Sequence, residues 1–263
     1  MPALWVAALL GLVEGVTEFL PVSSTGHLIL AAHALDFRGD FAEAFEVSIQ
    51  SGAIVAVLWL YRGRFLSLLR PAEPDRFGGP RGIALLAIVT LPVLVVGFAI
   101  RGFHERLLAP IPVAIALAAG AVGILLLERR RGDRGILGVE SLSPRIALGI
   151  GLFQCLALWP GISRSAATIA GGMLLGMKRS AAAELSFLAA VPALLAASAY
   201  EMWKVRGVLA PEHAAFLATG FVVAAVSAGF AVKGFTALLQ RTDMVPFAWY
   251  RLALAAVVLV VLL

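Results

Sequence analysis

The stretch that decides the fold is residues 12–30, LVEGVTEFLPVSSTGHLIL, in which a polar segment interrupts a run of apolar residues. A helix that crosses a bilayer needs about 20 mostly apolar residues. The apolar run over residues 2–35 is broken in its middle by Pro21 and the hydroxyl-bearing residues after it. Non-helical backbone at membrane depth is tolerated only where protein buries it or where it lines a wet cavity. We therefore predict a re-entrant hairpin over residues 2–35, two short helices around a polar turn.

A second hairpin of the same kind is predicted over residues 144–177, where Pro160-Gly-Ile-Ser-Arg-Ser165 breaks the apolar run. The whole chain of 263 residues is 61% hydrophobic and 14% charged, against about 45–50% and about 25% in soluble domains. This composition predicts an all-α polytopic membrane protein, with six transmembrane helices besides the two hairpins. The six apolar stretches are residues 41–61, 83–101, 110–127, 181–200, 213–233 and 246–263.

The chain also repeats itself in order. Residues 11–14, GLVE, align with residues 151–154, GLFQ, and residues 45–49, FEVSI, align with residues 183–187, AELSF. Each half then holds one hairpin and three spans, and an odd number of spans inverts the second half relative to the first. We predict one integral membrane domain over residues 1–263, with repeat one at about 1–127, a basic cytoplasmic linker at about 128–143 and repeat two at about 144–263.

Loop charge predicts the orientation, because cytoplasmic loops carry an excess of Lys and Arg. If the first span runs from outside to inside, fourteen cations fall inside and five outside, and both termini lie outside. The inside set is Arg62, Arg64, Arg70, Arg76, Arg81, Arg129, Arg130, Arg131, Arg134, Arg145, Lys178, Arg179, Lys233 and Arg241, and the outside set is Arg38, Arg101, Arg106, Lys204 and Arg206. The formal net charge of +5 is therefore assigned to topology rather than to nucleic acid.

Glu14 and Glu18 are ionisable groups inside an apolar segment, which makes them candidates for function. They are four residues apart and face the same side of a helix. Two such carboxylates can share a divalent cation, or one can serve as an acid or base. The alternative is that one buried acid simply pairs with Arg164.

The turn from Pro21 to His27 combines Ser23, Ser24, Thr25 and an imidazole. Hydroxyls beside a base are the components of nucleophilic catalysis, and His27 could accept or donate the proton. The alternative is ordinary turn and N-cap chemistry, since Ser and Thr commonly begin helices.

The second turn, Gly161-Ile-Ser-Arg-Ser165 followed by Thr168, suits an anion. A helix N-terminus attracts anions through its N–H groups, and an arginine offers a forked donor for phosphate oxygens. An arginine there is unfavourable to the helix dipole unless an anion is bound. The alternative is a structural Arg–Glu pair.

Three further polar residues within apolar stretches are assigned to structure. Glu46 and Glu184 occupy matching places in the two halves, which favours support of the hairpins by capping or hydrogen bonds. For Gln154, the neutral counterpart of Glu14, we favour a helix–helix hydrogen bond over a role in the cavity.

The segment from Glu14 to His27 resembles the E-x-x-x-E and P-V-S-S-T-G-H signatures of the bacterial undecaprenyl-pyrophosphate phosphatase family, also called the bacitracin-resistance protein family. The segment from Trp159 to Thr168 resembles its P-G-x-S-R-S-x-x-T signature, and the resemblance covers nearly the whole chain. It implies hydrolysis of undecaprenyl pyrophosphate to undecaprenyl phosphate and inorganic phosphate in the bacterial inner (plasma) membrane. This reaction recycles the lipid carrier of the cell wall and confers bacitracin resistance. The resemblance also implies Mg²⁺ or Ca²⁺ and a site that opens to the periplasmic or outer side.

Residues and resemblance together give a hypothesis for the site. Glu14 and Glu18 hold the cation, Arg164 and the N–H groups after Gly161 clamp the phosphate, and Ser24 or an activated water attacks. His27 is the acid or base. The hydrogen-bonding set is Ser23, Thr25, Ser163, Ser165 and Thr168.

The main rival is a secondary transporter or flippase for a polyprenyl phosphate, because inverted repeats and broken helices are transporter architecture. A purely structural membrane protein would leave the embedded polar groups unexplained. The expected partners are the lipid substrate and membrane lipids, with no nucleic acid, and the small-residue faces allow a homodimer.

Overall fold

The structure, a computed structural model, describes residues 3–71, 77–208 and 210–262, with the side chains of 103–106, 205 and 208 outside the description. In this part of the chain the regular elements are helices, eleven α-helices and four short 3-10 segments. The described residues contain no strand beyond an isolated bridge between Leu137 and Met177. The prediction of an all-α protein is confirmed.

Among the described residues, six helices are long and apolar enough to cross a membrane, which indicates a multi-pass membrane protein. Each overlaps one of the six predicted stretches. Some run further, because the charged residues at their ends continue the helix beyond the apolar run. The six are α3 (Asp40–Leu60), α5 (Gly79–Leu107), α6 (Pro110–Arg130), α9 (Arg179–Val205), α10 (Ala214–Leu239) and α11 (Val245–Leu262).

Both broken regions form two short helices around a turn, as predicted. The first pair is α1 (Leu4–Thr17) and α2 (Ser24–Ala34), and the second is α7 (Pro144–Gln154) and α8 (Arg164–Leu174). Each turn contains a proline, which has no N–H for a helical hydrogen bond and disfavours helical backbone in the residue before it. The helices of each pair pack against each other.

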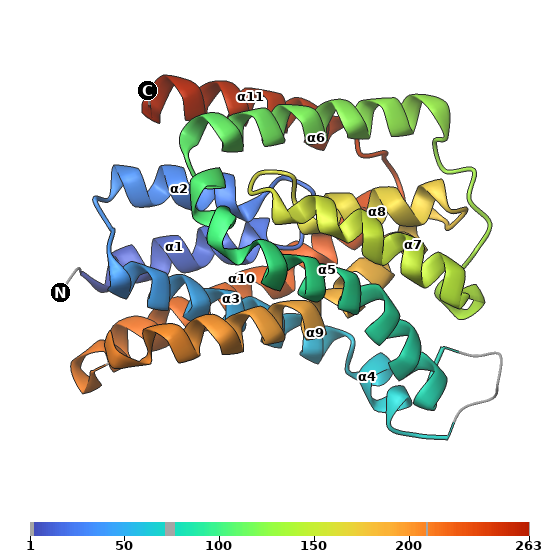
Figure 1. Cartoon of the computed structure of the whole chain (residues 1–263), viewed down its shortest axis with the longest axis horizontal. Helices are drawn as coiled ribbons and strands as arrows, with labels where there is room; N and C mark the ends of the chain where they lie inside the picture. Colours follow the sequence, from blue (N-terminus) through green and yellow to red (C-terminus); the bar gives the residue numbers. More distant parts are fainter. Residues whose placement is uncertain (1–2, 72–76, 209, 263) are drawn as a thin grey trace.

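The packing of the two halves is reciprocal. Helix α1 lies along α10, α7 lies along α5, and α3 packs on α9 and α10. Figure 1 shows α6 and α11 side by side, and these two helices are in contact. Glycines allow the closest approaches: a Cβ at Gly11 would lie 2.4 Å from the carbonyl oxygen of Gly220, and one at Gly151 would lie 2.7 Å from that of Val89. Gly11 and Gly151 are the aligned positions of the sequence repeat.

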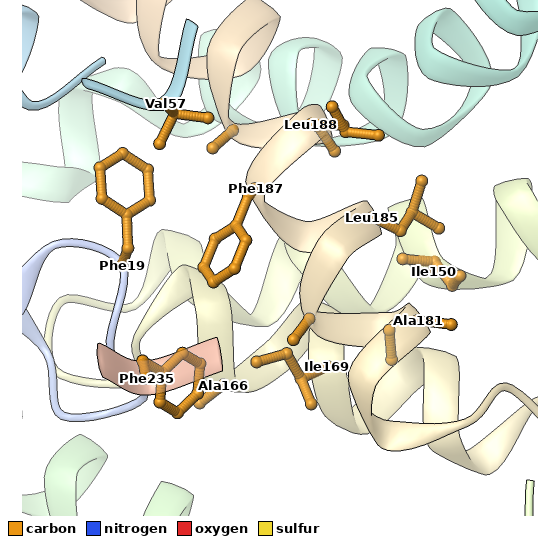
Figure 2. Packing of buried hydrophobic residues seen from close by; sticks show 14 of the residues in the cluster. Phe19, Val57, Ile150, Ala166, Ile169, Ala181, Leu185, Phe187, Leu188 and Phe235 are labelled. Carbon is orange, nitrogen blue, oxygen red and sulfur yellow. The ribbon is translucent and has the colours of Figure 1, made fainter. Parts of the chain in front are cut away.

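Aromatic packing fixes the first turn in the core. Phe19, which follows Glu18, has no exposed surface. Its ring meets that of Phe187 on α9 edge-on, with 6.0 Å between centroids, and Phe187 meets Phe235 on α10 at 6.1 Å. Figure 2 shows these rings among the aliphatic residues of α8 and α9. The polar turn is therefore held by apolar contacts on its flank.

Both ends of the described chain lie at one end of the bundle, and α4 (Arg62–Leu68) lies at the other (Figure 1). Not every cation of the loop count lies in a loop. Arg179 is buried at the start of α9, where Nη2 contacts Glu128 at 2.7 Å, and Lys233 lies within α10. Arg76 and the side chain of Arg106 fall outside the described residues.

Candidate active site

The first turn positions two carboxylates and two serines. Glu14 on α1 and Glu18 just after it are both buried. Ser23 has φ +72°, a left-handed backbone that is rare without glycine. Its hydroxyl accepts from the N–H of Gly26 at 3.5 Å and so caps α2. Ser24 is the first residue of that helix, and its hydroxyl donates to Oε2 of Glu18 at 2.6 Å.

Ser23 therefore has the role given by the alternative interpretation, that of a helix N-cap. Ser24 does not cap the helix. The hydroxyl of Ser24 donates to Oε2 of Glu18, and Arg164 contacts the other carboxylate oxygen, Oε1. A hydroxyl that donates to a buried carboxylate is oriented to lose its proton to that carboxylate. Thr25 follows Ser24 and is half-buried.

The second turn repeats this geometry. Ser163 has φ +71°, and its hydroxyl accepts from the N–H of Ala166 at 3.3 Å, so it caps α8. Gly161 has φ +105°, and a Cβ there would lie 2.6 Å from the carbonyl oxygen of Val113 on α6. The close approach that Gly161 permits is therefore to α6. The N–H of Ile162 donates within the turn to the carbonyl of Trp159 at 3.1 Å.

The two turns meet. The hydroxyl of Ser165 donates to the carbonyl of Leu20 at 2.8 Å, and the hydroxyl of Ser163 lies 3.4 Å from the same oxygen. Nη2 of Arg164, the first residue of α8, contacts Oε1 of Glu18 at 3.2 Å. Residues 146 positions apart thus form one cluster, so the two broken regions are in contact.

Arg164 is only partly satisfied by its neighbours. Nη1 donates to the carbonyl of Ser186 on α9 at 3.1 Å, and Nη2 donates to Oε1 of Glu18. The Arg–Glu pair that was considered as an alternative therefore forms. Nε is buried and, among the described residues, has no hydrogen-bond partner. Thr168 lies one turn further along α8, with its hydroxyl 2.6 Å from that of Ser186.

Glu14 carries the complementary unsatisfied atom. Its Oε2 is buried with no partner among the described residues. Glu18, Glu46 and Arg164 are the charged groups that act on it electrostatically. Buried polar atoms are satisfied in most native structures, so this unpaired acceptor and the unpaired donor of Arg164 are candidate contacts for a ligand.

The residues present fit a divalent cation within limits. Carboxylate oxygens are the ligands of Mg²⁺ and Ca²⁺. The part of the chain that the structure describes holds no group of three or more His, Cys, Asp or Glu that could bind a metal. Glu14 and Glu18 could supply two carboxylates, with the other positions left to water and phosphate oxygens, which is a common arrangement for Mg²⁺.

His27 lies away from Ser24. Its Nδ1 is 2.7 Å from the carbonyl of Ser23, and its Nε2 is 2.6 Å from the hydroxyl of Tyr250 on α11. A carbonyl only accepts, so we assign the hydrogen of the neutral imidazole to Nδ1, and Nε2 then accepts from Tyr250. The rings stack at 5.5 Å with an interplanar angle of 9°. The acid or base role of His27 stays a prediction.

The three residues that the sequence assigned to structural roles differ in their contacts. Gln154 donates to the carbonyl of Val89 on α5 at 3.2 Å, so the helix–helix hydrogen bond is confirmed. Glu184 accepts from Nε of Arg64 on α4 at 2.7 Å, so it supports α4 instead of a hairpin turn. Glu46 is exposed on α3 and lines a groove with Arg38 and Glu43. We expected Glu46 and Glu184 to support the two hairpins in matching ways. The hydrogen bond of Glu184 with Arg64 contradicts this expectation.

Three site residues escaped the sequence reasoning: Ser186, Tyr250 and Arg251. Ser186 aligns with Ser48 in the repeat, so the Glu-x-Ser pattern of both halves pointed to it. Arg251 is a lone charge in the last apolar stretch and is fully buried. Such a charge inside a span is a functional candidate by itself. Tyr250 precedes it and gave no separate signal.

Comparison with known proteins gives one consistent result. A family model described as bacitracin resistance protein BacA matches residues 7–257. A protein named undecaprenyl-diphosphatase from Nitratidesulfovibrio vulgaris (strain DP4) is 56% identical over 253 residues, 96% of each chain. Another of that name from Maridesulfovibrio salexigens is 52% identical over 260 residues, 98% of each chain. A third, from Nitrosomonas europaea, is 45% identical over 257 residues, 96% of this chain and 92% of its own.

Proposed function

The chain belongs to the bacitracin resistance protein BacA family, and from this we propose that it is a membrane phosphatase for undecaprenyl diphosphate. It hydrolyses the diphosphate to undecaprenyl phosphate and inorganic phosphate, which returns the lipid carrier to cell-wall synthesis. Removal of the diphosphate also accounts for resistance to bacitracin, which sequesters it. The observation that carries the proposal is the unsatisfied pair, Glu14 Oε2 and Arg164 Nε, beside the Ser24–Glu18 hydrogen bond.

The mechanism follows from the contacts of Glu18. Ser24 Oγ attacks the terminal phosphorus while its proton passes to Oε2 of Glu18, 2.6 Å away. The bond from that phosphorus to the bridging oxygen breaks, and undecaprenyl phosphate leaves. Water then attacks the phosphorus of the phosphate ester on Ser24. As the bond from phosphorus to Oγ breaks, the proton on Glu18 returns to Oγ, and inorganic phosphate is released. In the variant route, water takes the place of Ser24 in the first step, and Glu18 takes the proton of that water.

Arg164 stabilises the negative charge of the transferred phosphoryl group. Its Nε–H is the donor left without a protein partner, and Nη2 stays on Glu18. Removing a donor that acts on developing charge typically lowers kcat by about 10²–10³. Glu14 and Glu18 would hold Mg²⁺ or Ca²⁺, and when bound this cation supplies positive charge beside the diphosphate oxygens.

The prenyl tail has a suitable surface next to the first turn. A groove of about 480 Å³ runs along α1, α10 and α11 and includes Leu20. The carbonyl of Leu20 accepts from Ser165, so one lining residue of the groove belongs to the meeting point of the turns. Its lining is almost entirely apolar: Leu12, Val16, Leu20, Ser227, Phe230, Ala231, Gly234, Phe235, Leu238 and Phe247. This supports a tail that lies against the protein while the diphosphate reaches Ser24.

The finer architecture is also a proposal. The two broken regions are re-entrant hairpins, and the halves over residues 1–127 and 144–263 are inverted repeats joined by a cytoplasmic linker. Two features support this architecture. Helix α1 packs on α10 as α7 packs on α5, and Ser23 and Ser163 both have left-handed backbone. Both termini lie outside and the site opens to the periplasmic side, in line with the loop charges. The homodimer stays a prediction.

The test is phosphate release from undecaprenyl diphosphate by the purified protein, with and without EDTA. We expect metal-dependent release that falls at least about 100-fold in Arg164→Ala. No release by folded protein across several divalent cations would refute the phosphatase. In that case, movement of undecaprenyl phosphate between the leaflets of liposomes would test the flippase alternative, which the reciprocal packing of the halves favours.

A further inference from the structure

Arg251 is the buried charge that the mechanism does not use. It lies on α11 with no exposed surface. Each of its hydrogen bonds in the structure goes to a backbone carbonyl oxygen, and no carboxylate of the described residues forms an ion pair with it. Nε donates to Leu117 (3.3 Å), Nη1 to Pro21 (3.2 Å) and Ile162 (2.8 Å), and Nη2 to Ala116 (3.4 Å) and Gly161 (2.9 Å).

These five contacts account for the full hydrogen-bonding capacity of the side chain. A guanidinium has five N–H donors in a fixed planar fork, and the five carbonyls come from the first turn, the second turn and α6. A buried charge without a counter-ion is costly unless polar groups surround it. Here the carbonyl dipoles of three segments offset that cost together, so the charge is stable only while the three segments stay assembled.

The bonded carbonyls stand at matching places in the two turns. Pro21 precedes Ser23 by two residues, as Gly161 precedes Ser163. Both serines hold left-handed backbone, at φ +72° and +71°, which persists only where the surroundings enforce it. The residues after these serines are Ser24 and Arg164, the two that reach Glu18.

We propose that Arg251 is a positioning residue that holds the two turns in register, so that Ser24 and Arg164 meet on the same carboxylate. The proposal rests on the proposed phosphatase activity. Arg251 touches no substrate in this role and acts through the backbone of both turns. A lysine in its place would keep the charge but would end in one nitrogen, which cannot span carbonyls of three segments.

Gly120 on α6 allows a test that leaves Arg251 itself in place. A Cβ at Gly120 would lie 2.0 Å from Nη2 of Arg251 and 2.8 Å from Cζ, so Gly120→Ala displaces the guanidinium from Gly161 and Ala116. Alanine is the better helix former, so the substitution does not weaken α6 itself. Gly123→Ala is the matched control, because on the same helix a Cβ at Gly123 meets nothing within 4 Å.

We expect Gly120→Ala to lower kcat by about tenfold or more with KM nearly unchanged, because small displacements of reacting groups are costly in rate. Gly123→Ala keeps the wild-type kcat. Hydrogen exchange gives a second readout that needs no activity: amides in both turns, residues 18–24 and 159–165, exchange faster in Gly120→Ala only.

Arg251→Lys provides the direct variant, with Arg179→Lys as its control at another buried arginine. Arg179 pairs with Glu128 away from the turns, so its substitution lowers Tm and leaves kcat per folded molecule unchanged. Arg251→Lys lowers kcat as well. Equal kcat and equal exchange in Gly120→Ala and Gly123→Ala would overturn the positioning role. A wild-type protein without phosphate release would refute the phosphatase instead, and the exchange measurement would still decide the role of Arg251.

Discussion

Replacing Glu18 by Gln removes one charge at the meeting point of the turns and keeps the size of the side chain. In the wild type, Oε1 accepts from Arg164 at 3.2 Å and Oε2 accepts from Ser24 at 2.6 Å. Glutamine has one oxygen and one NH₂ group in these places. If the oxygen stays on Arg164, the NH₂ group faces Ser24, whose hydroxyl then has no proton acceptor.

The expected effect on rate is that of a lost general base, about 10²–10⁴ in kcat. At about 1.36 kcal/mol per factor of ten, this corresponds to about 2.7–5.4 kcal/mol of transition-state stabilisation. KM changes less, because Arg164 and its unsatisfied Nε remain. The folded state also loses part of a buried ion pair whose side chains are 11% and 7% exposed. Removing one partner of such a pair costs about 3–5 kcal/mol, an upper bound here because glutamine retains an acceptor.

The assay is phosphate release from undecaprenyl diphosphate, with kcat per folded molecule and Tm measured on the same sample. Glu128→Gln is the matched control, because Glu128 is 4% exposed and pairs with Arg179 as Glu18 pairs with Arg164. Both variants lower Tm, and only Glu18→Gln loses kcat. A kcat for Glu18→Gln within about threefold of wild type would refute the assignment of Glu18 as the base.

Three further outcomes follow from the contacts. Ser24→Ala lowers kcat by at least about 100-fold if the serine is the nucleophile, and a small loss would favour water attack. Glu14→Gln raises the Mg²⁺ concentration for half-maximal phosphate release at least about tenfold, and an unchanged metal titration would exclude Glu14 as a ligand. Gly15→Ala lowers Tm, since its Cβ would lie 2.1 Å from Oγ of Ser227 on α10, and overpacking costs about 1–3 kcal/mol; Gly229→Ala, with open space around its Cβ, is the control.

The sequence predicted the helices well, because their cause is local. Each span needs its own length of apolar residues, and each turn needs the proline that ends a helix. The stretch over residues 110–127 lies within α6 at Pro110–Arg130, and the break at Pro160 appears where it was expected. Helix α9 extends beyond the predicted stretch of residues 181–200 at both ends, because charged residues such as Arg179 continue a helix as readily as apolar ones.

The sequence also singled out Glu18, Ser24 and Arg164, which meet where the two turns are in contact, because polar groups stand out against an apolar background. It did not assign their partners. Ser23 and Ser24 are chemically identical in sequence, yet the left-handed backbone at Ser23 turns one hydroxyl to its own helix and the other to Glu18. The partner of His27 is Tyr250, 223 positions away, which no local pattern could supply.

Composition and order along the chain thus determined by themselves that this is a helical membrane protein with two polar turns inside apolar segments, because burial in a bilayer acts on each segment separately. Only the tertiary structure decided that Glu18 is shared by Ser24 and Arg164, that Ser186 supports Arg164, and that Arg251 binds the carbonyls of both turns. The contacts of Arg164 with Glu18 and of Arg251 with Pro21 join residues 146 and 230 positions apart. Such contacts depend on how closely the helices approach one another, which glycines such as Gly11 and Gly151 allow.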